Sequence, residues 1–172
     1  VVTSIAAGYA FSLAVTDDGA CYSWGFNEVG QLGHGHRFNS HHPVRVAGLA
    51  NEHIVAVACG QQHSLALAAN GSVYSWGLGV FGQLGHGTLH NSPRPQLIAG
   101  ITGDSVHCGA HFSVVLRRNQ PPYVFGHAEY GQHAGVTNYQ DWNAGESEAA
   151  LRGAERPHAM PRVPEAFKGM TL

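Results

Sequence analysis

The feature that most constrains the fold of this 172-residue chain is an internal repeat. The hexapeptide GQLGHG occurs at 30–35 and again at 82–87. Three longer segments align without a gap from Gly8, Gly60 and Gly109; they read GYAFSLAVTDDGACYSWG, GQQHSLALAANGSVYSWG and GAHFSVVLRRNQPPYVFG. Their first glycines are 52 and then 49 residues apart. A repeat of this period indicates one supersecondary unit that stacks on its neighbours to bury a shared core.

Each repeat begins with three short strands. IVAVAC before Gly60 and SLALA after it are short apolar runs, as expected of strands that are packed on both faces. Asp18-Gly19 and Asn70-Gly71 lie between apolar runs and predict two-residue hairpin turns with positive φ. The pentapeptides CYSWG and VYSWG alternate large and small side chains, so they predict a third strand on which Trp24 and Trp76 are the largest packing groups.

A fourth strand, begun by Pro, is expected at 43–49 and again at 95–101, because Pro is tolerated on an edge strand. Four antiparallel strands make one blade, whose two apolar faces must be covered by neighbours. The sequence therefore predicts an all-β chain of three four-stranded antiparallel blades. The expected blades are 1–52, 53–103 and 104–172, the last with an insertion at 137–158.

The repeated hexapeptide is interpreted as turn chemistry. Its glycines meet the backbone demands of a tight loop, and its Gln side chain can satisfy backbone groups of that loop. Where the second repeat has His63, the others have Phe11 and Phe112, so a packed and hydrogen-bonded histidine is expected there, not a ligand. The residues to which the repeat assigns a structural role are Gly8, Trp24, Gly25, Gly30, Gln31, Gly33, Gly60, His63, Trp76, Gly77, Gly82, Gln83, Gly85, Gly109, Gly126 and Gly131.

The third repeat departs from the other two. NQPP at 119–122 replaces the Asn-Gly turn, so a wider hairpin is expected there. The polar insertion at 137–158 is either a tolerated surface loop or a functional one, since long loops on a repeat scaffold often carry function. The candidate partner-binding residues in this insertion are Tyr139, Asp141, Trp142, Arg152 and Arg156.

The succession GxxHSLAL, NG, YSWG and GQLGHG in the second repeat resembles the repeat of the regulator of chromosome condensation (RCC1) family. The resemblance covers essentially 1–135 and 160–172. It implies an RCC1-like β-propeller that normally has seven blades, of which this chain would supply three. For the founding member it implies promotion of nucleotide exchange on the small GTPase Ran by contact, without catalytic residues of its own.

Two functions follow as hypotheses. The first is a protein–protein interaction or scaffold module of an RCC1-like regulatory protein, acting through loops on one face of the propeller. The alternative is a guanine-nucleotide exchange factor for a small Ran-like GTPase. The expected partners are another protein, such as a small GTPase, and the remaining propeller blades, supplied by the same chain or by another.

Composition argues against several other classes. The net charge is −2 and no basic run is present, so this segment lacks the electrostatic footprint of a nucleic-acid-binding protein. Three cysteines are too few for a disulfide framework, which favours an intracellular compartment, cytoplasmic or nuclear. The longest apolar runs are far shorter than the ~20 residues that span a bilayer.

The histidines of the two GQLGHG loops invite a metal hypothesis. A glycine-flanked loop, however, does not hold ligands firmly, and no Asp or Glu recurs beside these histidines to orient them. The sequence also shows no nucleophile–His–acid set and no pattern of paired carboxylates. It therefore predicts no metal, no cofactor and no enzymatic activity.

Overall fold

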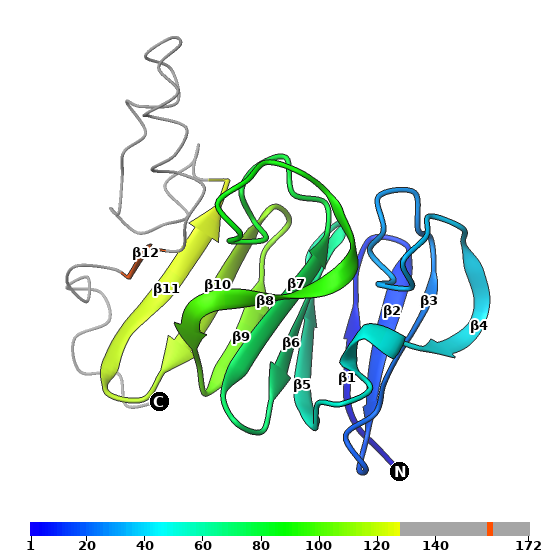
Figure 1. Cartoon of the computed structure of the whole chain (residues 1–172), viewed down its shortest axis with the longest axis horizontal. Coiled ribbons are helices and arrows are strands. Elements are labelled where there is room, and N and C mark those ends of the chain that lie inside the picture. Colours follow the sequence, from blue (N-terminus) through cyan, green and yellow to red (C-terminus); the bar gives the residue numbers. More distant parts are fainter. Residues whose placement is uncertain (128–157, 160–172) are drawn as a thin grey trace, which may run out of the picture.

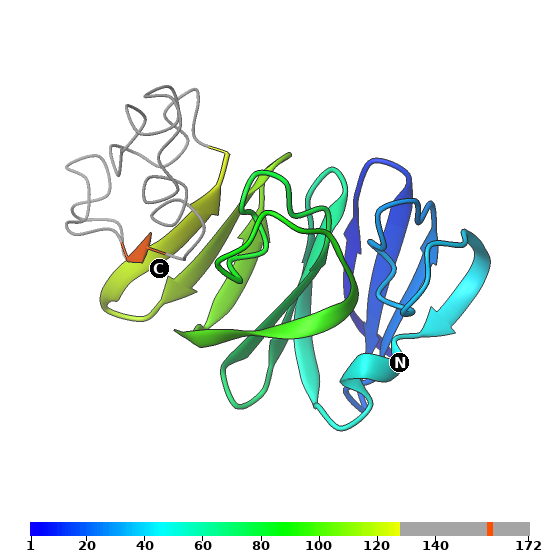
Figure 2. The ribbon, with the colours of Figure 1, turned by 45° about the horizontal axis from the view of Figure 1, so that its top comes forward.

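The computed structural model describes residues 1–127 and 158–159. As predicted, this part of the chain is all-β, and its strands form three four-stranded antiparallel sheets that stand side by side (Figures 1 and 2). The first sheet contains β1 (Val2–Ala7), β2 (Phe11–Thr16), β3 (Cys21–Gly25) and β4 (Ser40–Arg45). The second contains β5 (Ile54–Cys59), β6 (His63–Ala68), β7 (Ser72–Gly77) and β8 (Ser92–Thr102). The third contains β9 (Ser105–Cys108), β10 (Phe112–Arg117), β11 (Gln120–Gly126) and β12 (His158–Ala159).

The repeat in the sequence is also a repeat in strand register. In the first sheet Ala7 pairs with Ser12, and in the second the residues 52 positions later, Cys59 and Ser64, form the same pair. Each sheet is a meander in which every strand pairs with the next strand along the chain. The boundaries expected at 52/53 and 103/104 remain predictions, and the expected insertion at 137–158 falls almost wholly outside the described residues.

The apolar core lies between the sheets. The interface between the first and second sheets is built from Phe11, Leu13 and Val15 of β2, Ile54 and Val57 of β5, and Trp76 of β7, among others. The interface between the second and third sheets is built in the same way, from Leu65, Leu67, Val73, Val106, Val115 and Phe125 with their neighbours. Each sheet therefore buries its apolar side chains only because another sheet lies against it.

The first glycine of each repeat makes room for an aromatic ring. The ring of Phe11 lies where a Cβ at Gly8 would stand, and the imidazole of His63 has the same relation to Gly60. The third repeat has the same contact between Gly109 and a phenyl ring. The spacing Gly-x-x-aromatic in the sequence is thus a packing motif.

The first two hairpin turns differ from the two-residue turns predicted. Residues 17–20 join β2 to β3, and 69–71 join β6 to β7. Only Gly19 and Gly71 have positive φ there (80° and 86°), because a longer turn needs a single left-handed residue. The side chains of Asp18 and Asn70 instead accept hydrogen bonds from the backbone N–H two residues later. This Asx geometry explains why these residue types precede the glycine.

The third hairpin is tight, so the wider turn predicted at 119–122 is wrong. Only Arg118 and Asn119 separate β10 from β11, and Asn119 takes the left-handed conformation with φ of 56°. Asparagine tolerates this region better than most residues. Pro121 and Pro122 lie inside β11, next to a shift of register opposite β10, where a missing N–H is tolerated.

The fourth strands also begin earlier than predicted. Both β4 and β8 contain their prolines and do not start at them. As the edge strand of its sheet, β4 can accommodate Pro43. A 3-10 helix, η1 (Ala47–Leu49), replaces the second half of the strand expected at 43–49. Leu49 of this helix is buried in the interface between the first two sheets.

Candidate functional site

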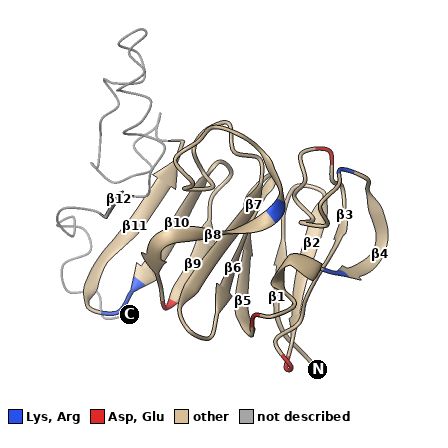
Figure 3. Cartoon of the chain, viewed as in Figure 1, with Lys and Arg blue, Asp and Glu red and all other residues tan. Residues whose placement is uncertain are grey.

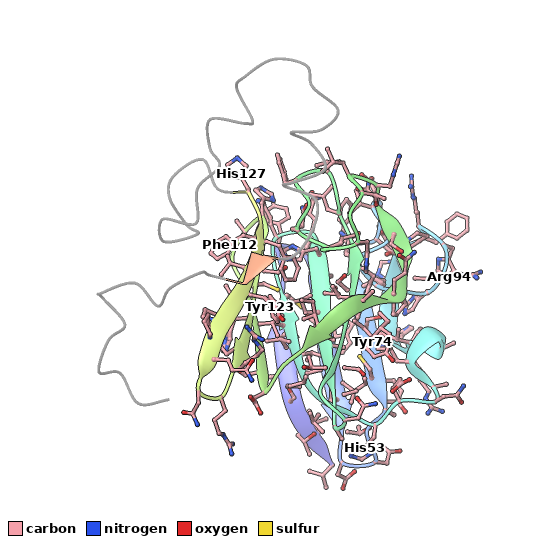
Figure 4. All side chains as sticks on the ribbon, turned by 60° about the vertical axis from the view of Figure 1, so that its left-hand side comes forward. His53, Tyr74, Arg94, Phe112, Tyr123 and His127 are labelled. Carbon is pink, nitrogen blue, oxygen red and sulfur yellow. The ribbon has the colours of Figure 1, made fainter. Side chains whose placement is uncertain are left out.

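The connections that carry the repeated hexapeptide lie at one end of the sheets, at the top of Figure 1. We call this end the loop face and define it by residues 8–10, 26–39, 60–62, 78–91 and 109–111. The other end carries the hairpins and is called the hairpin end, defined by residues 17–20, 50–53, 69–71, 103–104 and 117–119. In Figure 4, His127 lies near the loop face and His53 at the hairpin end.

Internal hydrogen bonds hold the first hexapeptide loop in shape. The side-chain oxygen of Gln31 accepts from the N–H of Val29 (3.2 Å), and Leu32 is fully buried. The hydroxyl of Ser23 on β3 donates to the Leu32 carbonyl (2.7 Å) and is hydrogen-bonded to Nε2 of His34 (2.8 Å). Because the single hydroxyl proton goes to the carbonyl, Nε2–H of His34 is the donor in the second bond.

The second hexapeptide loop repeats these bonds. Gln83 accepts from the N–H of Phe81 (2.9 Å), and Ser75 on β7 donates to the Leu84 carbonyl (2.6 Å) while bonded to Nε2 of His86 (2.9 Å). Burial lowers the pKa of His86 below its usual 6.5. Burial, followed by the charge of His36, does the same to the pKa of His34. The histidines of the two hexapeptides are therefore held as neutral hydrogen-bond donors.

Asparagines that the sequence reading did not single out complete the loops. The buried Asn27 accepts from the N–H of Leu32 (2.9 Å) and donates to the carbonyls of His36 and Phe38 (both 2.9 Å). Asn39 accepts from the backbone N–H of Asn27 (2.8 Å), and Asn91 accepts from that of Gly79 (2.9 Å), the second residue of each loop. Asn39 and Asn91 are 52 residues apart, so the repeat spacing would have revealed this pair.

Bonds between sheets tie the loops into one platform. The N–H of Tyr9 donates to the Gln61 carbonyl (3.1 Å), and the N–H of Gln61 donates to the Ala110 carbonyl (2.9 Å). The Gln31 carbonyl accepts two bonds from the second sheet, from the hydroxyl of Ser64 and the indole N–H of Trp76, both at 2.8 Å. The backbone of the loop face is thereby fixed across all three sheets.

The next interface uses the equivalent glutamine carbonyl, that of Gln83, with a different set of donors. The hydroxyl of Ser113 donates to the Gln83 carbonyl (2.8 Å) and is bonded to Nε2 of His63 (2.9 Å). Phe125 replaces the tryptophan, so no indole N–H reaches this carbonyl. His63 is fully buried, and burial lowers its pKa to about 3, so it is neutral at physiological pH.

Aromatic and histidine side chains are abundant on the loop face. Tyr9 and Phe38 are 76% and 78% exposed, and Val80 is also exposed. Where the second and third sheets meet, the ring of Phe81 lies 4.9 Å from that of His111 and 5.1 Å from that of His127, centroid to centroid. Burial, followed by the charge of His127, lowers the pKa of His111.

Charged side chains gather at the opposite end. Figure 3 shows acidic and basic positions at the hairpin end of the described chain, whereas the loop face has few. The charged residues of the hairpin end are Asp17, Asp18, Glu52, Asp104, Arg117 and Arg118, and those of the loop face are Glu28 and Arg37. The loop face therefore combines exposed aromatic groups with little charge.

The predicted site residues fall into two groups. All five candidate partner-binding residues of the insertion lie outside the described residues, as does Gly131. Of the predicted structural residues, Trp76 is fully buried, whereas Trp24 is only half-buried. The glycines at 25, 30, 33, 77, 82, 85 and 126 all have positive φ, which only glycine adopts without strain.

Within residues 1–127, no group of three or more His, Cys, Asp or Glu side chains is arranged to hold a metal ion. The three cysteines are free, and burial raises the pKa of each thiol, to about 12 for Cys21. In the same part of the chain, no helix is long and apolar enough to cross a membrane.

Comparison with known proteins identifies the repeat. The sequence profile of the regulator of chromosome condensation (RCC1) repeat matches residues 18–67 and 70–116, and a second profile of that repeat matches 2–31 and 54–83. The protein RCC2 homolog of Danio rerio is 44% identical over 126 residues, which are 72% of this chain and 26% of the relative.

Two solved structures share the fold of this chain at 26% sequence identity. Human WBSCR16 superposes with a TM-score of 0.77 over 99% of this chain and 39% of its own. Prp20p from Saccharomyces cerevisiae, described together with its binding properties to Gsp1p and histones, superposes with a TM-score of 0.68 over 92% of this chain and 38% of its own. This chain therefore spans about a quarter of the length of its RCC2 relative and under two fifths of these structures. The chain belongs to the regulator of chromosome condensation (RCC1) repeat family.

Proposed function

We propose that this chain is a protein-interaction module of an RCC1-like regulatory protein, and that its loop face binds another protein. One observation carries the proposal: exposed aromatic side chains lie on the loop face, whereas most of the charge lies at the hairpin end. The centres of protein–protein interfaces are enriched in aromatic residues and depleted of charged ones. The loop face has that composition.

The rigidity of the loop face supports the same function. The hydrogen bonds from Tyr9 N–H to the Gln61 carbonyl and from Gln61 N–H to the Ala110 carbonyl fix the backbone that carries the exposed Tyr9 before any partner binds. Binding to a preformed surface loses less conformational entropy than binding to a mobile one. An exposed tyrosine on a fixed backbone is therefore a suitable anchor for a partner.

The insertion after β11 is proposed as a second part of the same interface. β11 ends at Gly126, at its loop end, so the chain enters the following segment from the loop face. Within 137–158 we propose that a partner is contacted by Tyr139, Asp141, Trp142, Arg152 and Arg156. Such a partner would be intracellular, as the free cysteines favour.

The second candidate function is nucleotide exchange on a small Ran-like GTPase by contact. It is supported by the similarity to Prp20p, which is described with its binding to Gsp1p. This function requires no catalytic side chain of the chain itself, only a surface that favours the nucleotide-free GTPase. We propose no covalent chemistry for this chain under either function.

Affinity capture with matched variants tests the first function. The unaltered chain is compared with a Tyr9→Ala and Phe38→Ala double variant and with a variant that lacks 137–158. The control is a Val44→Ala and Leu97→Ala double variant, which removes exposed apolar groups from β4 and β8, away from the loop face. We expect the captured partner to be lost with the first two variants and retained by the control. Loss with the control alone would contradict the proposal.

Release of a fluorescent guanine nucleotide from a loaded Ran-like GTPase distinguishes the second function from the first. Faster release in the presence of the chain supports exchange activity, and an unchanged rate at saturating chain concentration excludes it for this segment. The Tyr9→Ala and Phe38→Ala variant serves as the control, since exchange through the loop face must be weakened by it.

A further inference from the structure

Three aromatic rings meet at the loop face where the second and third sheets adjoin. We call Phe81, His111 and His127 the aromatic cluster. The ring centroid of Phe81 lies 4.9 Å from that of His111 and 5.1 Å from that of His127, and the two imidazole centroids are 6.4 Å apart. All three side chains are half-buried, and Figure 4 shows His127 near the loop face. The aromatic cluster is therefore packed and also accessible from solvent.

The repeat does not require these rings. At the junction of the first and second sheets, the aligned residues are Val29, Gln62 and Leu78, which lie 52 or 49 positions earlier in the sequence. Both junctions have the hydrogen bond from a serine hydroxyl to a glutamine carbonyl. Because one junction is built without any of the three rings, the aromatic cluster is not a demand of the fold.

Hydrogen bonds fix the backbone from which the rings project. The N–H of Phe81 donates to the side-chain oxygen of Gln83 (2.9 Å), and the N–H of His127 donates to the carbonyl of His111 (2.9 Å). The carbonyl of Ala110, next to His111, accepts from the N–H of Gln61 (2.9 Å). A partner that contacts the aromatic cluster therefore orders little of this backbone when it binds.

The aromatic cluster lies in a part of the loop face that has no acidic or basic side chain apart from histidine. Residues 78–91, 109–111 and 127 contain no Lys, Arg, Asp or Glu. His111 interacts electrostatically with His127 and with the buried His63. Burial, followed by the charge of His127, lowers the pKa of His111, so its imidazole is neutral at physiological pH. In the described chain, these segments thus offer ring faces without a fixed cation of their own.

An arginine side chain fits this chemistry better than the alternatives. The negative face of an aromatic ring attracts a cation, and the planar guanidinium also stacks on rings and donates N–H groups to neutral imidazole nitrogens. The chain already contains one such contact, in which Cζ of Arg117 lies 3.9 Å from the ring centroid of Tyr123. A carboxylate would be repelled by the ring faces, and an apolar side chain would leave desolvated imidazole nitrogens without a partner.

We propose that the aromatic cluster binds an arginine side chain of the protein that the loop face recognises. Phe81, whose ring lies close to both imidazoles, is the central contact for the guanidinium, and His111 and His127 flank it. The inference rests on the proposed function of the loop face, and it adds which side chain the partner contributes and where that side chain binds.

Small amide probes test the site in the full chain at pH 8, where imidazoles are neutral. Nα-acetyl-arginine amide is compared with the citrulline amide, which has nearly the same shape but no charge, and with the glutamate amide. The imidazole C–H signals of His111 and His127 report binding by NMR; they are identified by their loss in His111→Gln and His127→Leu, which introduce the residues of the preceding repeat. We expect the arginine probe to shift both signals to saturation, with an affinity about two- to fivefold above that of the citrulline probe.

Matched variants test the contribution of each ring. Phe81→Val and His111→Gln, which also introduce the residues of the preceding repeat, should each weaken the arginine probe about two- to fivefold. The control is His107→Gln, the same replacement at an exposed histidine of β9, and it should leave the affinity unchanged. Circular dichroism checks that each variant folds, and either variant of the cluster is decisive if the other does not fold.

Three results would overturn the proposal: equal affinity for the arginine and citrulline probes, an unchanged affinity in the cluster variants, or a larger shift with the glutamate probe, which would assign an acidic partner instead. Affinity capture separates this proposal from the proposed function. If the partner is lost with the Tyr9→Ala and Phe38→Ala variant but bound with unchanged affinity by Phe81→Val, the loop face binds a partner and the arginine site is wrong. If neither variant affects capture while the arginine probe still binds, the proposed function is wrong and arginine recognition by the aromatic cluster stands.

Discussion

Replacing His63 by phenylalanine should remove a defined part of the acid sensitivity of this fold. His63 is fully buried between the second and third sheets, and burial lowers its pKa to about 3, followed by the charge of His111 as a lesser cause. Phenylalanine is the natural residue at the aligned positions, Phe11 and Phe112. The substitution therefore keeps an aromatic ring over Gly60 while it removes the titrating group.

The sign of the effect follows from proton binding. Between pH 3 and 6.5 the unfolded chain binds a proton at this position and the folded chain does not, so stability falls as the pH falls through that window. At pH 7 both states are largely neutral. Since pH 5 lies one and a half units below the ordinary histidine pKa of 6.5, proton binding stabilises the unfolded state there by about 2 kcal/mol, at about 1.36 kcal/mol per unit. Between pH 7 and pH 5, the free energy of unfolding should therefore fall by about 2 kcal/mol less in His63→Phe than in the unaltered chain.

Urea unfolding followed by circular dichroism at both pH values measures this difference. At pH 7 the substitution should cost about 1 kcal/mol, since the bond to Ser113 is lost while Ser113 still donates to the Gln83 carbonyl. The control is His42→Phe, which makes the same replacement at an exposed histidine of β4. If the unaltered chain and His63→Phe lose the same stability between pH 7 and pH 5, then His63 is not held neutral by burial and the reasoning is wrong.

Three further outcomes test the packing. Trp76→Phe and Ser64→Ala should each lower the free energy of unfolding by about 1 kcal/mol. The double variant should lose about 1 to 2 kcal/mol more than the sum of the two, because only the double variant leaves the Gln31 carbonyl without a donor. Chemical denaturation measures this coupling, and strict additivity would refute it. Gly60→Ala should lower the free energy of unfolding by about 1 to 3 kcal/mol, since its Cβ would meet the imidazole ring of His63 and a backbone carbonyl 2.7 Å away. An unchanged melting temperature would contradict that packing. Cys21, whose pKa burial raises to about 12, should resist iodoacetamide at pH 8 in the folded chain and react after unfolding, as mass spectrometry would show.

The sequence was sufficient to predict those parts of the fold that depend on repetition. Four strands per repeat, their antiparallel order and the packing role of the second tryptophan all follow from the alternation of apolar residues and the spacing of the glycines. These features could be predicted because every repeat packs in the same way, so an interpretation of one repeat can be checked against the next. Leu32 and Leu84, for example, are both buried in aligned loops.

Features that depend on what lies beside a residue could not be predicted in this way. Trp24 and Trp76 have the same sequence context, yet one is half-buried and the other fully buried, because within the described part of the chain only Trp76 faces another sheet. The turn lengths differ from those predicted for a related reason. Asp18 and Asn70 accept hydrogen bonds from the backbone two residues later, and this local choice between turn types leaves no trace in the apolar pattern.

The hydrogen bonds of the hexapeptide indicate where function must be sought in such a chain. The Gln side chain of GQLGHG bonds within its own loop, and the His side chain bonds to a serine of the strand that precedes the loop. The Leu is buried beneath the loop, and the Gln31 carbonyl accepts hydrogen bonds from the next sheet. The side chains that the repeats share are therefore largely committed to holding the sheets together. A partner must be recognised by positions at which the repeats differ, such as Tyr9, which aligns with Gln61 and Ala110. The most repeated residues of this sequence are thus the poorest guide to its partner, and the exposed positions at which the repeats differ are the best.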